Sequence, residues 1–316
     1  MNFKDTDAIF KRYERMKNMR GTWEQHWEEI AERVLPRSAE FTGDRTTGDK
    51  RTQKVFDATS GLALERFAAA VESLLTPRGA KWHTLRASDI ELNQVPEVAG
   101  WFDAVENILF HYRYAPRSNF SSQMHESYMS LGAFGTGGIY VDEMAAEGFR
   151  YRSVHLADMF IAENQHGIID TVYRRINCSA RQAVMMFPDG NFSKELTDKA
   201  DDNPDERVDL VHVVAPRGDR DASKRNRVNM EFGSGYYEVK TKSLIQEGGF
   251  TNFPYIISRY VTTSREVYGR SPAMLVLPDI KMLNQMSRVT IRAGEKVVDP
   301  PLLIADDGVI LPVNTR

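Results

Sequence analysis

The sequence has a single cysteine, Cys178, among its 316 residues. No disulfide can form within the chain, and an isolated cysteine without a neighbouring base is usually inert, so we expect Cys178 to be inert. Long apolar runs are also missing. No window approaches the roughly 18 uninterrupted apolar residues that a membrane-spanning helix needs, and residues 1–17 lack the apolar centre of a secretory signal. We expect a folded protein made in the cytosol.

An excess of positive charge is absent as well. The formal net charge is −3 and the pI is about 6.2. This excludes a strongly basic protein that binds nucleic acid by neutralising its phosphates, but it allows one past which DNA slides. One local basic run lies at 37–56, which we interpret as a solvated loop. The run within it consists of Arg45, Lys50, Arg51 and Lys54.

Motifs of local chemistry are missing too. Neither GxSxG nor HExxH occurs, and the seven histidines are scattered without metal-ligand spacing. We predict no cofactor, no metal and no enzymatic activity. The alternative is a nucleic-acid-processing enzyme that assembles an Mg²⁺ site from distant carboxylates, for which Asp142, Asp158 and Asp170 are the candidates.

A glycine-rich stretch, LGAFGTGGIYVDE at 131–143, raises the possibility of a phosphate site. Phosphate-binding loops run from a strand through glycines into a helix N-terminus. Here a helical pattern precedes the glycines, a strand pattern follows them, and the stretch contains no Lys or Arg. The order therefore predicts a helix that ends at glycines and leads into a strand.

Apolar periodicity divides the chain into a helical part and a strand-rich part. Helices are predicted at 5–35, with Gly21 as a kink or break, at 58–76, and across 94–131 as two segments, 94–113 and 117–131. A strand is predicted at 81–88. After the glycines, short β-branched and aromatic runs predict antiparallel strands, a short helix ends at Pro188 and a polar segment follows it. The fold class is therefore α+β.

The last segment changes character once more. Pro272 and Pro278 precede an apolar stripe of roughly twenty residues that begins near Asp279. The sequence Asp299-Pro300-Pro301 ends this helix, because a residue before proline avoids the α conformation. The stripe needs a partner.

Four stretches, in this order, resemble the bacteriophage head-to-tail connecting proteins, the portal proteins of short-tailed phages. Any one of them alone is weak, whereas four in the family's order are specific. They are RGTWEQHWEEIAERVLPR at 20–37, FDATSGLALERFAAAVESLLTPRGAKWHTL at 56–85, LGAFGTGGIYVDE at 131–143 and YGRSPAMLVLPDIKMLNQMSRVTIRAGEKVVDPPLLIADDGV at 268–309.

The resemblance implies a ring, usually of twelve subunits, at one capsid vertex of the virion. The ring would assemble in the bacterial cytoplasm and act as a conduit for double-stranded DNA. Its other partners would be capsid and scaffolding proteins, tail adaptors and the terminase motor. On that mapping, residues 1–271 form a wing domain, 272–298 the first stem helix and 299–316 the start of a clip. Family members continue into a second stem helix and a crown, so the resemblance also implies a C-terminally shortened chain.

Site residues follow from this mapping. We predict that Lys281, Arg288, Arg292 and Lys296 face DNA or neighbouring subunits, and that the clip contacts an adaptor or the motor. A third interpretation, an adaptor that binds other proteins as a monomer, stays open. The predicted clip contacts are Asp299, Pro300, Pro301, Asp306 and Asp307.

Overall fold

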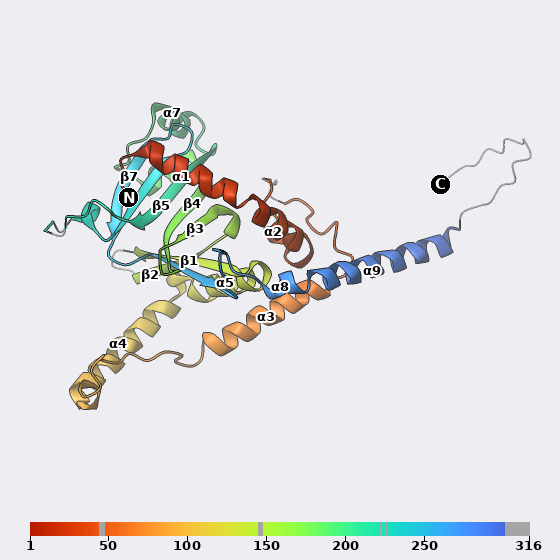
Figure 1. Ribbon diagram of the computed structural model, residues 1–316, viewed down its shortest axis with the longest axis horizontal. Helices are drawn as coiled ribbons and strands as arrows, with labels where there is room; N and C mark the ends of the chain where they lie inside the picture. The colour runs from red at the N-terminus through yellow and green to blue at the C-terminus, as the bar shows by residue number, and fades with distance from the viewer. Residues whose placement is uncertain (44–47, 145–147, 222, 225, 301–316) are drawn as a thin grey trace, which may run out of the picture.

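A computed structural model describes residues 1–43, 48–144, 148–221, 223–224 and 226–300 (Figure 1). Two antiparallel sheets and the helices packed on them form a body, from which α4 and α9 project in different directions. The α+β class with antiparallel strands is thus confirmed.

The helices of the first half of the chain precede the strands in sequence. The later helices either cover the sheets or lead away from them. In chain order the helices are α1 (Thr6–Met19), α2 (Gly21–Val34), α3 (Thr59–Leu75), α4 (Pro96–Tyr114), α5 (Phe120–Phe134), α6 (Ala180–Met186), α7 (Lys194–Asp202), α8 (Pro272–Leu275) and α9 (Leu277–Val298).

The strands form one three-stranded sheet in the order β2-β1-β8 and one five-stranded sheet in the order β3-β4-β5-β6-β7. Neighbouring strands are antiparallel in both. The strands are β1 (Thr136–Met144), β2 (Gly148–Val154), β3 (Met159–Glu163), β4 (Ile169–Ser179), β5 (Arg207–Pro216), β6 (Phe232–Glu238), β7 (Leu244–Phe250) and β8 (Tyr255–Arg259).

Strand β5 is buried on both faces, which places it at the centre of the body. Val211, Val213 and Ala215 alternate towards α1 and pack with Phe10. Val214 points the other way, into the larger core shared with α5 and the three-stranded sheet. The near-continuous apolar sequence of this strand is therefore explained by a layer on each side.

Helix α5 connects the helical part to the sheets. It packs against α3 on one side and against β1 and β2 on the other. Its end, from Ser127 to Phe134, is almost wholly buried. The glycine stretch that follows α5 consequently lies inside the body.

The helix predicted at 5–35 is interrupted where the sequence indicated. Arg20 is both the C-cap of α1 and the residue before α2, which begins at Gly21. Likewise, the predicted helical region 94–131 is split by a short 3₁₀ turn, Pro116–Ser118.

Two predictions of local structure were wrong. Residues 81–87 contain no strand; Trp82 instead stacks near Phe120, so its alternating side chains belong to an aromatic cluster beside α4. The polar segment after Pro188 contains α7, which sequence reasoning missed because only Leu196 in it is buried. Ser193 caps this helix by accepting a hydrogen bond from the backbone amide of Leu196.

Candidate functional site: the projecting helix and its base

The glycine stretch serves packing. Gly135 ends α5 in the left-handed conformation with φ of 78°, as predicted for a C-terminal glycine. A Cβ atom at Gly137 would lie 2.6 Å from the Ser127 hydroxyl, and one at Gly138 would lie 2.5 Å from Met159 Cε. The glycines let β1 pass close to α5 and to β3, which accounts for them without a phosphate.

The side chains of the three candidate metal ligands do not come together in one site. Asp142 lies on β1 opposite Arg150, and Asp158 pairs with Arg175 at 3.0 Å. Asp170, on β4, accepts a hydrogen bond from the Thr171 hydroxyl. Among the described residues, no group of three or more His, Cys, Asp or Glu side chains could hold a metal ion. The acidic cluster that the alternative interpretation requires is therefore not formed by these three residues, which lie in separate elements.

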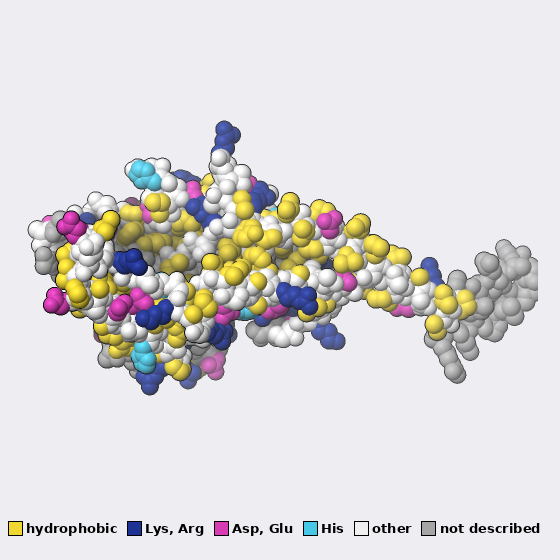
Figure 2. Space-filling model, turned by 90° about the horizontal axis from the view of Figure 1, so that it is seen from below, with side chains coloured by type: hydrophobic (Ala, Val, Ile, Leu, Met, Phe, Trp, Pro, Cys, Tyr) yellow, Lys and Arg dark blue, Asp and Glu magenta, His cyan; other side chains and the backbone are white. Residues whose placement is uncertain are grey.

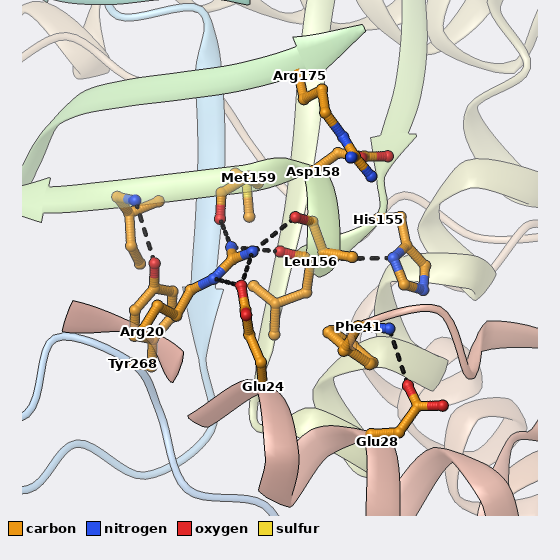
Figure 3. A network of polar contacts seen from close by, with 12 residues as sticks. Arg20, Glu24, Glu28, Phe41, His155, Leu156, Asp158, Met159, Arg175 and Tyr268 are labelled. Atoms are coloured by element: carbon orange, nitrogen blue, oxygen red, sulfur yellow. Dashed lines mark hydrogen bonds and ion pairs between the residues drawn. The ribbon is translucent and has the colours of Figure 1, made fainter. Parts of the chain in front are cut away.

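A buried arginine joins the α1–α2 break to the sheet (Figure 3). The Arg20 side chain is only 2% exposed. It donates to the backbone carbonyls of Leu156, Ala157 and Met159 at 2.9, 2.6 and 2.7 Å, and its charge is balanced by Glu24 at 2.7 Å. Such complete pairing is what a buried guanidinium requires. Nothing in the local sequence predicts the three carbonyl partners, because they lie over 130 residues away.

His212 is another satisfied buried polar group. One ring nitrogen lies 2.8 Å from the Tyr255 hydroxyl and the other lies 2.9 Å from the Ser234 hydroxyl. The ring stacks on Tyr236 with centroids 4.1 Å apart. Burial lowers the pKa of His212 to about 3, so the imidazole is neutral at physiological pH. It is a core residue, and the partner of each ring nitrogen is a hydroxyl group.

The base of α9 is attached to the body by polar contacts. Lys281 pairs with Glu29 of α2 at 2.6 Å, which holds the pKa of Glu29 below its usual range. Asn284 accepts hydrogen bonds from the backbone amides of Phe56 and Asp57 and donates to a third backbone group, the carbonyl of Lys54. These contacts tie the loop before α3 to α9.

Arg288 and the residues beyond it differ from the base. The guanidinium of Arg288 lies 5.4 Å from the centroid of the Phe56 ring. Arg292 and Lys296, further out, form no hydrogen bond or ion pair with any residue that the structure describes, and both are exposed. The four basic residues predicted from sequence therefore divide into two anchored near the body and two on the projecting half.

An apolar groove of about 320 Å³ lies beneath the base of α9. Its walls come from the end of α2, from α3, from Gly132 of α5 and from α8 and α9. Figure 2 shows apolar side chains over this part of the molecule and along the projection. In the part of the chain that the structure describes, no helix is both long and apolar enough to cross a membrane.

Residues 6–316 match the family described as bacteriophage head to tail connecting protein. The chain belongs to this family. It is 30% identical over 299 residues to the probable portal protein of Bordetella phage BPP-1, covering 93% of this chain and 53% of that protein. It is 27% identical over 307 residues to the portal protein of Salmonella phage epsilon15, covering 95% and 54%. The chain spans about half the length of these curated relatives, and the resemblance read from its sequence is confirmed.

Helix α9 of this head-to-tail connecting protein ends just before the residues predicted as clip contacts. Asp299 is the C-cap of α9 and Pro300 is exposed. Pro301, Asp306 and Asp307 lie outside the described residues. Their predicted role in adaptor or motor contact stays a prediction.

Proposed function

We propose that this chain is a structural subunit of a phage portal, a ring at one capsid vertex through which double-stranded DNA is packaged and ejected. The observation that carries the proposal is the family match across residues 6–316. Nearly the whole chain is also similar to two portal proteins. The role is a conduit and docking platform and involves no catalysis, in keeping with the separation of Asp142, Asp158 and Asp170.

The projecting helix fits the part of a stem. α9 has 22 residues and spans about 33 Å. Leu277, at its start, is its one buried residue among those described. A helix with an apolar stripe and so little cover from its own chain needs neighbours, and a closed ring of head-to-tail contacts supplies them.

The proposed layout assigns the body, residues 1–271, to a wing, 272–298 to the first stem helix, and 299–316 to the start of a clip. The proposed partners are other copies of the chain, DNA, capsid and scaffolding proteins, tail adaptors and the terminase motor. The mildly negative net charge suits a channel that does not hold DNA by its phosphates. The place of action is the virion, after assembly in the bacterial cytoplasm.

The first experiment is the solution mass of the purified chain, followed by electron microscopy of the particle it forms. Rings with a central hole are expected. A chain that stays monomeric at all concentrations, also when extended to the length of its relatives, would contradict the portal proposal.

The channel-side basic residues have a separate test. Alanine at Lys281, Arg288, Arg292 and Lys296 together is expected to reduce DNA packaging or ring formation. The matched control places alanine at four exposed basic residues of the N-terminal region: Lys4, Lys11, Arg15 and Lys17. If packaging and ring formation were equally normal in both variants, the role assigned to the four α9 residues would be wrong.

A further inference from the structure

Helix α4 leaves large apolar side chains exposed next to the side on which it packs. Within it, the one buried residue is Glu106, which pairs with Lys81 at 3.1 Å and accepts from the Leu85 amide. Trp101 and Ile108 are 61% and 54% exposed. A surface helix normally turns its large apolar side chains towards the body and its polar side chains towards solvent. The described part of the chain therefore does not cover these apolar residues of α4, which leaves them available to a partner.

The exposed apolar residues of α4 form one continuous stripe. Trp101, Ile108 and Tyr112 are separated by seven and four positions, so they lie on the same side of the helix. Leu92, just before α4, is also exposed. We define the arm as residues 87–112, which Figure 1 shows projecting from the body.

The arm is acidic throughout. Residues 87–112 contain five acidic side chains and no Lys or Arg. Apart from Glu106, which is paired inside, all are exposed. Glu91 and Glu97 lie near the apolar stripe, since Glu97 is one turn before Trp101. The remaining two are Asp89 and Asp103.

Helix α9 carries the complementary pattern. Met282, Met286, Val289 and Val297 are separated by four, three and eight positions, so they too share one stripe, and each is more than half exposed. Between 280 and 298 the basic residues number four, Lys281, Arg288, Arg292 and Lys296, against one acidic residue, Glu295, which gives a net charge of +3.

The two surfaces cannot meet within one molecule. Figure 1 shows the arm and α9 leaving the body in different directions. The two helices are of similar length, 19 and 22 residues, or about 28 and 33 Å. Each surface has an apolar stripe with charged residues beside it, and the charges are opposite in sign. Opposite charges across an interface favour association and fix its register.

We propose that the arm of one copy of this chain docks along α9 of a second copy, with the Trp101–Tyr112 stripe on the Met282–Val297 stripe. Glu91 and Glu97 lie beside Arg292 and Lys296 across this contact. The contact is heterologous, because different surfaces of the two copies meet, and such contacts close into rings when their rotation permits. The inference rests on the proposed ring and specifies which surfaces build it.

Cross-linking tests the proximity directly. Ala104 lies between Trp101 and Ile108 on the arm stripe, and Ala293 lies between Val289 and Val297 on the α9 stripe; both are exposed. The double variant Ala104→Cys, Ala293→Cys is expected to give a ladder of disulfide-linked oligomers under mild oxidation. Native Cys178 is buried and stays outside the reaction.

The matched control moves one cysteine to the opposite side of α4. Asp103 is exposed and, two positions after Trp101, lies roughly 200° around the helix from it, on the side away from the stripe. The pair Asp103→Cys, Ala293→Cys is expected to give at least tenfold less cross-linked product. Equal cross-linking by both pairs, or none by the first, would overturn the proposed contact.

Charge exchange tests the energetics. Glu91→Lys with Glu97→Lys is expected to weaken association at least tenfold, as is Arg292→Glu with Lys296→Glu. Combining all four changes in one chain restores opposite charges and is expected to recover most of the association. Failure of the combined variant to recover, with each variant folded by circular dichroism, would contradict the pairing.

The outcomes separate this inference from the portal proposal. Rings without Ala104–Ala293 cross-links would overturn the arm contact and leave the ring intact, with another protein or a downstream segment as the partner of the arm. Cross-links in open chains without rings would support the contact and count against the portal. Neither rings nor cross-links would overturn both.

Discussion

The body and the two projecting helices differ in which side chains they bury. In the body, even charged side chains are enclosed: Arg20 has carbonyl and carboxylate partners on every side, and His212 has a hydroxyl at each ring nitrogen. In α4 and α9, apolar side chains such as Trp101 and Met286 face solvent. Amphipathic periodicity in a sequence therefore identifies a helix, but it does not indicate whether the same chain covers the apolar side of that helix.

The largest effect is expected from Arg20→Ala in the body. The change leaves three buried carbonyls and the Glu24 carboxylate without their donor, and such a loss costs about 3–5 kcal/mol of unfolding free energy. Urea denaturation measures it, with exposed Arg15→Ala as the control. A loss below about 1 kcal/mol would show that the network contributes little.

Two glycine substitutions are expected to have opposite signs. At Gly135, alanine must adopt a positive φ, and its Cβ would overlap the carbonyl of Gly269, so we expect a loss of about 3 kcal/mol. At Gly294, on projecting α9, nothing lies within 4 Å, and alanine is expected to gain up to about 1 kcal/mol of helix stability. Thermal unfolding of both variants compares them; effects of the same sign would contradict the contrast.

His212 gives the body a pH dependence. Its pKa is about 3 in the folded chain and near 6.5 in the unfolded chain, so the unfolded chain binds more protons below pH 6.5. Stability therefore falls as the pH drops, by about 2 kcal/mol between pH 7.5 and 5. Unfolding free energies of His212→Gln across this range should lack that slope. The exposed His111→Gln control should keep it, and an unchanged slope in His212→Gln would reject the assignment.

The smallest effect is expected where body and projection join. Asn284→Ala removes three hydrogen bonds to an exposed loop, which we expect to cost about 1 kcal/mol. Amide exchange at Phe56 and Asp57 should become faster, while Gln285→Ala, the neighbouring exposed position, should leave it unchanged. Unaltered protection at both amides would mean that the loop is held by other contacts.

Local signals in the sequence were sufficient for the elements whose structure depends on neighbours along the chain. The end of α5 at Gly135 followed from the position of the glycines, and the interruption of the 5–35 helix followed from Gly21 within it. The α+β class followed from the change of pattern after residue 135. Residues 81–87 were misassigned because alternation of side chains also occurs where an irregular segment packs on an aromatic cluster.

The remainder depends on contacts between distant residues. The partners of Arg20 and the separation of Asp158 from Asp170 are set by the tertiary fold, which spacing in the sequence does not record. The burial of Glu106 on α4 could not be predicted either, since its partners, Lys81 and the Leu85 amide, belong to the irregular segment before the helix. The basic residues Arg292 and Lys296 were placed on α9 correctly, while what they face is still a prediction.

The turn at Gly135 also has a mechanical consequence. The segment leading to α8 is fastened to it, because the Gly269 amide donates to the Thr136 hydroxyl at 2.9 Å and the Ser271 hydroxyl donates to the Ala133 carbonyl at 2.8 Å. Tension applied along α9 therefore passes directly into α5 and β1. We expect α9 to unfold before the hydrogen bonds at Thr136 and Ala133 break. A single-molecule pulling experiment would record this as a first extension of about 5 nm. The body would then act as a rigid mount and α9 as the compliant part of the subunit.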